Sequence, residues 1–288
     1  MSAPVSVIMP AFRAEATIAA SVASVLGQSV GDFELVIAAD DWADYAGVLA
    51  AAGIADPRIV FTGTGGTGTG GTGTGSANAR NTALRAARHK FVATLDADDR
   101  FAPQKLETGA AVLLVHPLVT TGLSIETSAG RPLRQVGCTG TTALLGGADY
   151  KRVNLSMDSM VMWDRERVPV SYDATLPCLV DLELMLQAFG HVDAALHIGA
   201  PLHVYVKQPA SMSNAPGSSP VYALTKQALI TRIKAGQYSF NYVKARNAFL
   251  KFLKLSLKAE QDYETALDST PGLIFEDILE PLLAEPGA

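Results

Sequence analysis

Two carboxylates separated by one residue follow a short apolar run in the first half of the chain. The run Phe91–Leu95 has the composition of a buried strand, and it leads directly into Asp96, Asp98 and Asp99. Carboxylates at this D-x-D spacing can share one Mg²⁺ or Mn²⁺, which usually keeps substrate phosphate in its shell. Such a cation offsets the charge that develops on a departing diphosphate. The alternative is that these acids are solvated and cap the next helix.

An aromatic ring and a carboxylate are expected at two neighbouring strand ends. Phe12 follows Pro10 after the predicted strand Val5–Met9, which we expect Pro10 to end, and Asp40 follows the predicted strand Phe33–Ala38. Together they can hold a nucleotide base and bond its N–H edge. The alternative is a turn-forming proline and a phenylalanine that packs in the core.

Two predicted helices carry charged side chains in their first turns. Arg80 lies in the first turn of the helix Ala77–Arg88, where a guanidinium can pair with a base carbonyl or a phosphate or can simply be solvated. Asp181 and Glu183 lie two apart in the helix Leu179–Phe189, so they point in different directions. One can face a cleft and act as a general base while the other caps or pairs. Both can equally be acids that the helix dipole favours.

A segment of only glycine and threonine, TGTGGTGTGGTGTG, runs from Thr62 to Gly75. It contains G-x-G-x-x-G between a strand and a helix, with Asp96 beyond it, which is the order expected of an NAD(P)-dependent Rossmann oxidoreductase. The motif fits in several registers, however, and the segment is too long for a tight turn. A ribose also needs one acid rather than three. We therefore expect a flexible loop at the rim of the ligand site.

Short apolar runs alternate with helical patterns over the first hundred residues. Strands are expected at Val5–Met9, Phe33–Ala38, Arg58–Phe61 and Phe91–Leu95, with helices at Ala16–Leu26, Tyr45–Ala52 and Ala77–Arg88. This alternation predicts an α/β fold with a mainly parallel, Rossmann-like sheet and helices on both faces. Ligands of such sheets bind beyond the carboxyl ends of the strands, where the acids gather. We expect a catalytic domain over residues 1–215 and a C-terminal helical extension over residues 216–288.

The composition excludes several classes of protein. The net charge of −5 over 288 residues argues against a nucleic-acid binder, and the 48% apolar content is enough for a full core. Cys138 and Cys178 form no framework and are expected as free thiols, and the five histidines show no zinc-site spacing. No basic leader and no membrane-spanning run is evident, so the expected location is the cytoplasm.

Five stretches, taken in order, resemble the family 2 glycosyltransferases over roughly residues 5–213. They are VSVIMPAF, FELVIAADD, ANARNTALRAARHKFVATLDADD, SYDATLPCLVDLEL and VYVKQPASMSN. The resemblance implies a GT-A fold and an inverting transfer from a UDP- or GDP-type sugar donor to an unknown acceptor hydroxyl, with Mn²⁺ or Mg²⁺. It also leaves open a non-catalytic relative that only binds the nucleotide sugar.

The resemblance assigns a role to each matching residue. Asp98 would be the direct metal ligand and Asp181 the catalytic base, while Asp96 would lie near the ribose and the metal. Arg80 would contact base or phosphate. The nucleotide pocket would be lined by Pro10, Phe12, Glu15 and Asp40.

The sequence departs from the family pattern at several positions. Asp40 is followed by Asp41 and Trp42 rather than by an acid and Gly-Ser, which leaves the register uncertain by one residue. Val180 stands where an acid precedes the base, and Lys207 and Gln208 replace a familiar arginine and, in some relatives, a histidine. A third metal ligand from the protein is therefore in doubt, and His203 is a weak substitute.

The predicted helix Asn241–Lys258 combines a basic surface with an apolar stripe. Its stretch Tyr242–Lys258 has five basic residues and no acid. The stripe consists of Phe249, Phe252, Leu253 and Leu257. It can pack on the catalytic domain or on a second copy to form a homodimer. Alternatively, it can lie on an anionic membrane, which would place the protein at the inner face of that membrane next to a lipid-linked acceptor.

Overall fold

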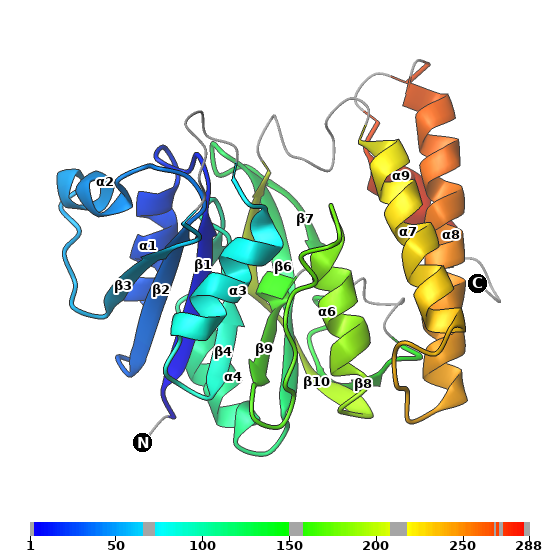
Figure 1. Ribbon diagram of the computed structural model, residues 1–288, viewed down its shortest axis with the longest axis horizontal. Helices are drawn as coiled ribbons and strands as arrows, with labels where there is room; N and C mark the ends of the chain where they lie inside the picture. Colours follow the sequence, from blue (N-terminus) through cyan, green and yellow to red (C-terminus); the bar gives the residue numbers. More distant parts are fainter. Residues whose placement is uncertain are drawn as a thin grey trace.

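The computed structural model describes residues 3–65, 73–149, 158–207, 218–267, 269–270 and 273–284. These residues form one large sheet with helices packed around it (Figure 1). The strands are β1 (Val5–Ala11), β2 (Phe33–Ala39), β3 (Ile59–Gly63), β4 (Phe91–Thr94), β5 (Arg100–Phe101), β6 (Leu118–Thr127), β7 (Pro132–Val136), β8 (Thr142–Gly146), β9 (Val161–Asp164) and β10 (Ala194–Lys207). The helices are α1 (Ile18–Leu26), α2 (Tyr45–Ala51), α3 (Ser76–Ala86), α4 (Lys105–Leu113), α6 (Val180–Ala188), α7 (Ser219–Lys234), α8 (Val243–Leu267) and α9 (Phe275–Ala284), with a 3₁₀ turn η1 (Asp158–Met160).

The main path of the sheet runs β3-β2-β1-β4-β9-β6-β10-β5 among the described residues, with β7 added to β6 and β8 to β10. Strands β3, β2, β1 and β4 are parallel, and so is the pair β6–β10. Strand β9 is antiparallel to both β4 and β6 and joins the two parallel parts. The carboxyl ends of β1, β2 and β4 therefore lie along one edge, where polar residues follow each strand.

Two hydrophobic clusters cover the two faces of the sheet. One face packs against α1 and α4, with Ile18 and Leu106 fully buried. The other face packs against α3 and α6, with Ala83 and Leu184 buried. The continuous apolar runs of β1, β2 and β4 are buried on both sides, as parallel strands require. The predicted α/β fold with helices on both faces is confirmed.

Strand β1 continues through Pro10 to Ala11, so the expectation that Pro10 ends the strand is wrong. Ladder partners on the β4 side extend from Val5 to Ile8, and Ile8 accepts a hydrogen bond from the Leu95 N–H. Because residues of a strand alternate in direction, Pro10 also faces the β4 side, beyond the end of β4. Its missing N–H therefore costs no ladder bond there.

The C-terminal helices pack into the same core as the sheet. Phe249, Phe252 and Leu253 of α8 are buried and belong to the cluster that also contains α6 and β6 residues. Figure 1 shows α7, α8 and α9 together at the end of the molecule opposite α2. The predicted boundary at residue 215 lies outside the described residues, and the division into two domains stays a prediction. No helix in the described part of the chain is both long and apolar enough to span a membrane.

Candidate functional site

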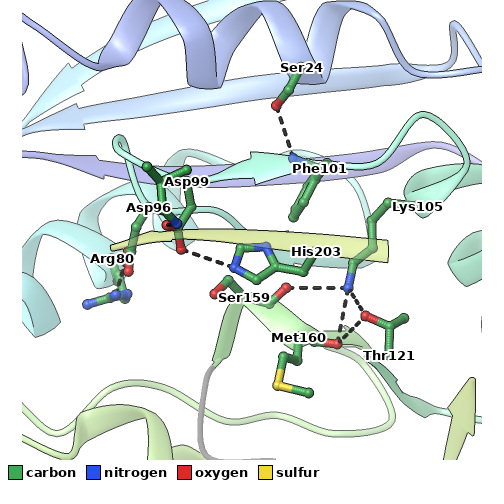
Figure 2. A network of polar contacts seen from close by, with 11 residues as sticks. Ser24, Arg80, Asp96, Asp99, Phe101, Lys105, Thr121, Ser159, Met160 and His203 are labelled. Carbon is green, nitrogen blue, oxygen red and sulfur yellow. Dashed lines mark hydrogen bonds and ion pairs between the residues drawn. The ribbon is translucent and has the colours of Figure 1, made fainter. Parts of the chain in front are cut away.

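Asp99, the third acid of the D-x-D stretch, anchors this loop to strand β10. Asp99 is fully buried, and its Oδ2 lies 3.0 Å from His203 Nε2 (Figure 2). Its Oδ1 accepts a hydrogen bond from the Val206 N–H at 2.9 Å. With a carboxylate as its partner, Nε2 carries the proton. Strand β10 thus fixes the loop from one side, and Asp96 and Asp98 remain partly exposed at its surface.

His203 supports the acids rather than offering its Nε2 to a metal ion. It is fully buried, and its ring meets the edge of Phe101 with centroids 6.1 Å apart. Within the described ranges, no three His, Cys, Asp or Glu side chains form a group that could hold a metal ion. A cation at this loop would therefore take one or two carboxylates and complete its shell with substrate oxygens and water, which suits Mg²⁺ or Mn²⁺.

Arg80 is buried beside the D-x-D loop, so the solvated-arginine alternative is wrong. Its Nη2 lies 2.6 Å from Asp96 Oδ1, and its guanidinium sits 5.6 Å from the ring centroid of Tyr172. The Tyr172 hydroxyl lies 2.9 Å from Thr94 Oγ1, at the end of β4. Burial raises the pKa of Asp98. A backbone hydrogen bond and the charges of Arg80 and His203 lower it, but burial is the larger effect. A cation next to Asp98 would favour its ionised form.

Asp40 ties both flanks of the glycine/threonine segment to the end of β2. Its Oδ1 accepts hydrogen bonds from Thr64 Oγ1 at 2.9 Å and from the Thr74 N–H at 2.8 Å, and its Oδ2 accepts from the Gly75 N–H at 2.8 Å. Gly73 passes so close that a Cβ atom there would stand 2.3 Å from Asp40 Oδ2. The carboxylate predicted to bond a base thus also closes the loop. Residues 66–72 of the predicted flexible loop lie outside the described residues.

Asp41, which the sequence left ambiguous, holds the turn after β1. Its Oδ2 accepts hydrogen bonds from the Arg13 N–H at 2.6 Å and from the Tyr45 hydroxyl at 3.0 Å. Arg13 adopts a positive φ of 50° in this turn. Phe12 is 43% exposed, so it does not pack in the core, and Glu15 is also exposed. The two neighbouring acids therefore hold different loops at the same sheet edge: Asp40 holds the loop after β3, and Asp41 holds the turn after β1.

Asp181 lines a cavity of about 270 Å³ at the start of α6. Leu179, the N-cap residue of α6, has a left-handed φ of 57°, which turns the chain sharply into the helix. Glu183 is buried and accepts a hydrogen bond from Gln187 Nε2 at 2.7 Å, so the two acids point in different directions as expected. Tyr205 of β10 lines the same cavity, and burial raises its pKa to about 12, with the charges of Asp99 and Asp98 contributing.

One charged residue of this region gave no sequence signal. Lys105 is fully buried at the start of α4, and its Nζ donates hydrogen bonds to Thr121 Oγ1 at 2.8 Å, the Ser159 carbonyl at 3.3 Å and the Met160 carbonyl at 3.1 Å (Figure 2). Burial lowers the pKa of Lys105 to about 7, although three acceptors favour the charged ammonium. Lys105 thereby ties the helix after the D-x-D loop to η1.

A sheet of this topology, with acids after β2 and β4 and a further acid at the start of α6, defines the GT-A class of fold. Residues 6–135 match the model of Glycosyl transferase family 2. A curated relative in Escherichia coli is UDP-Glc:alpha-D-GlcNAc-diphosphoundecaprenol beta-1,3-glucosyltransferase WfgD, which is 39% identical over 110 residues. That match covers 38% of this chain and 41% of WfgD, so the chain matches well under half of its relative's length.

Two solved structures share the fold at low sequence identity. TarS 1–349 of S. aureus, in complex with UDP-GlcNAc, has a TM-score of 0.73 at 16% identity, over 97% of this chain and 80% of that chain. The mannosyltransferase PcManGT from Pyrobaculum calidifontis, in complex with GDP-Man and Mn²⁺, has a TM-score of 0.56 at 17% identity, over 96% and 78% of the two chains. Both likenesses support the GT-A fold.

Proposed function

We propose that the chain is an inverting glycosyltransferase that moves a sugar from a nucleotide-diphosphate donor to an acceptor hydroxyl. The observation that carries the proposal is the D-x-D loop, whose third acid is buried and whose first two remain accessible beside Arg80. The match of residues 6–135 to the model of Glycosyl transferase family 2 supports the reaction class. The UDP-GlcNAc complex of TarS and the GDP-Man complex of PcManGT support a UDP- or GDP-type donor.

The donor would lie along the carboxyl ends of β1, β2 and β4. Phe12, exposed after β1, and Asp40, after β2, would flank the base. Pro10, near the end of β1, and Glu15, beyond the turn, would lie beside them. The guanidinium of Arg80, held in place by Asp96 and Tyr172, would face the phosphates.

Asp98 would hold Mn²⁺ or Mg²⁺, with Asp96 close to the ribose and the ion. The donor set fits such an ion, because one or two carboxylates plus substrate phosphate is the usual shell of Mg²⁺. When bound, the ion would supply positive charge to the leaving diphosphate. Mn²⁺ in the PcManGT complex supports the same choice of metal.

Asp181 would act as the general base on the acceptor. Its carboxylate would take the proton from an acceptor hydroxyl, and that oxygen would form a bond to the anomeric carbon of the donor sugar. The bond from this carbon to the diphosphate would break on the opposite face, so the nucleoside diphosphate leaves and the configuration inverts. Asp181 and Tyr205 line the same cavity, and Tyr205 is close enough to Asp99 and Asp98 for their charges to help burial raise its pKa. This proximity of the cavity to the D-x-D loop supports the role of Asp181.

A lipid-linked acceptor at a membrane surface would suit the basic face of α8. Lys244, Lys251 and Lys254 are exposed. The apolar stripe of the helix faces the core, where Phe249, Phe252 and Leu253 are buried and Leu257 is partly buried. Because the stripe packs into the hydrophobic core of the chain, any membrane contact would be electrostatic. WfgD is named for a diphosphoundecaprenol-linked acceptor. The homodimer stays a prediction.

A nucleotide titration tests the proposed function. UDP, GDP or both should raise the melting temperature in the presence of Mn²⁺, because a ligand that binds the folded state stabilises it by mass action. Asp98→Asn should lose the part of the shift that depends on Mn²⁺. Stabilisation by NADH, with none by either nucleoside diphosphate, would contradict the proposal and favour the oxidoreductase alternative.

A further inference from the structure

The cavity that contains Asp181 lies between the catalytic sheet and the C-terminal helices. Its described lining comes from β6, β7, α6 and β10 on one side and from α7, α8 and α9 on the other. Helix α9 forms one wall through Phe275, Glu276 and Leu279. The cavity is thus built by both predicted parts of the chain, and the donor residues at the ends of β1 and β2 are not among its lining residues.

The lining mixes aromatic faces with charged groups. Tyr205, Tyr222, Phe252 and Phe275 supply rings. Lys226 lies 4.2 Å from the ring centroid of Phe275 and forms a buried ion pair with Glu260. If the ligand were the acyl chain of a lipid, it would offer no hydrogen bonds to this ion pair, and leaving buried charged groups without hydrogen bonds costs free energy. This lining therefore suits a ligand that has both apolar C–H faces and polar hydroxyls.

One carboxylate oxygen in this wall is buried without a hydrogen-bond partner among the described residues. It is Glu276 Oε2, while the other oxygen, Oε1, lies 3.6 Å from Arg134 Nη2. Arg134 also pairs with Glu280, so α9 is fastened to β7 by ion pairs at two of its residues. A buried acceptor of this kind requires a donor, and a ligand hydroxyl would supply one.

We infer that this cavity is the acceptor subsite and that it holds a sugar ring of a glycoside acceptor. The ring would place one hydroxyl at Asp181 and another at Glu276, with its C–H face against the aromatic side chains. The inference rests on the proposed transferase function and names the acceptor class for it. At about 270 Å³ the cavity lies just below the usual range of small-molecule pockets and suits one ring rather than a long lipid chain.

The test fills the cavity without touching the donor residues. Ser256 of α8 lines the cavity and is 3% exposed, so Ser256→Leu would project extra atoms into it. Gln261→Leu is the matched control, because Gln261 lies on the same helix and is exposed. Glu276→Ala is a second variant that removes the buried acceptor without adding volume. Binding is measured by saturation-transfer NMR with the methyl glycosides of glucose, N-acetylglucosamine, galactose and mannose.

At least one methyl glycoside should bind the wild type and Gln261→Leu. Its affinity should fall about tenfold or more in Ser256→Leu and in Glu276→Ala, because steric exclusion or a lost charged hydrogen bond has that effect. Affinity for nucleoside diphosphate with Mn²⁺ should stay unchanged in all three variants. Loss of donor binding by the wild type would instead count against the proposed function itself.

Three results would overturn the inference. Equal glycoside binding by Ser256→Leu and Gln261→Leu would place the sugar elsewhere. Failure of every methyl glycoside to bind the wild type would exclude a sugar ring. Binding of decyl phosphate that Ser256→Leu abolishes, with no glycoside binding, would assign the cavity to a lipid chain.

Discussion

Buried polar contacts from distant parts of the chain hold the D-x-D loop in place. Asp99 bonds His203 and Val206 of β10, and Lys105 binds the carbonyls of η1. Asp96 and Asp98 can then face a ligand without having to secure their own backbone. Each of these supporting residues buries a polar group, and such a group destabilises the folded state unless it keeps its hydrogen-bond partners.

Lys105 predicts a pH dependence of stability. Its folded-state pKa of about 7 lies below its ordinary value of 10.5, so between these values the unfolded chain holds a proton that the folded chain lacks. Stability should therefore rise with pH across this window, by up to about 1.4 kcal/mol per unit. Urea unfolding from pH 7.5 to 9.5 should show a steeper rise for the wild type than for Lys105→Met. The control Lys234→Met, at an exposed position, should keep the wild-type slope.

Parallel pH profiles for the wild type and Lys105→Met would show that Lys105 stays charged when folded. His197, whose pKa is lowered by burial and by the charge of Lys105, titrates below this window and does not affect the comparison.

Lys105 could not have been identified from the sequence, since its carbonyl partners lie 54 and 55 residues away. Asp96, Asp98, Arg80 and Asp181 stood out because strand and helix patterns flank each of them directly.

Short loops between strands and helices are the elements that carry the site. The continuous apolar runs of β1, β2 and β4 could be predicted because burial on both faces leaves a pattern in the sequence. The sequence did not place strands β5, β7, β8 and β9 individually. Strand β8 is largely exposed and is held through its pairing with β10, and such a tertiary contact leaves no local pattern. Pro10 was misjudged because its tolerance depends on where the neighbouring strand ends.

The hydrogen bonds between Asp40 and the loop after β3 should contribute to stability and to nucleotide binding. Gly73→Ala would bring a Cβ to 2.3 Å from Asp40 Oδ2 and 2.8 Å from the Asp40 carbonyl oxygen. We expect a loss of about 1–3 kcal/mol of unfolding free energy, together with weaker nucleotide binding, both measurable by urea unfolding and by titration. Gly31→Ala is the control, since a Cβ there meets nothing within 4 Å. Unchanged stability and affinity in Gly73→Ala would show that the attachment does not matter.

At the scale of the whole molecule, the C-terminal helices share a hydrophobic core with the sheet. Phe249 of α8 packs against Phe189, at the end of α6, with ring centroids 5.6 Å apart, and against Phe240 at 5.7 Å. The sequence identified the apolar stripe of this helix but could not choose its partner. A stripe of this kind looks the same whether it meets a sheet, a second copy or a membrane.

Removing one ring from this contact should destabilise the whole chain. Phe249 is 1% exposed, so Phe249→Ala should cost about 3–5 kcal/mol of unfolding free energy through lost burial and a cavity. Val243→Ala on the same helix is the control, because Val243 is 71% exposed and should change stability little. Urea unfolding that shows one transition, shifted only in Phe249→Ala, would agree with a shared core. Two separate transitions would show that the helices fold apart from the sheet.

The most direct test of the proposed function is the effect of Asp181→Asn on sugar transfer. The assay measures release of nucleoside diphosphate from the nucleotide sugar selected by titration, with Mn²⁺ and a glycoside acceptor. The variant should bind the nucleotide as the wild type does, and its turnover should fall by about 10²–10⁴-fold, which is the usual contribution of a general base. Turnover near that of the wild type would contradict the assignment of Asp181. Absence of turnover in the wild type, with intact donor binding, would favour a non-catalytic relative.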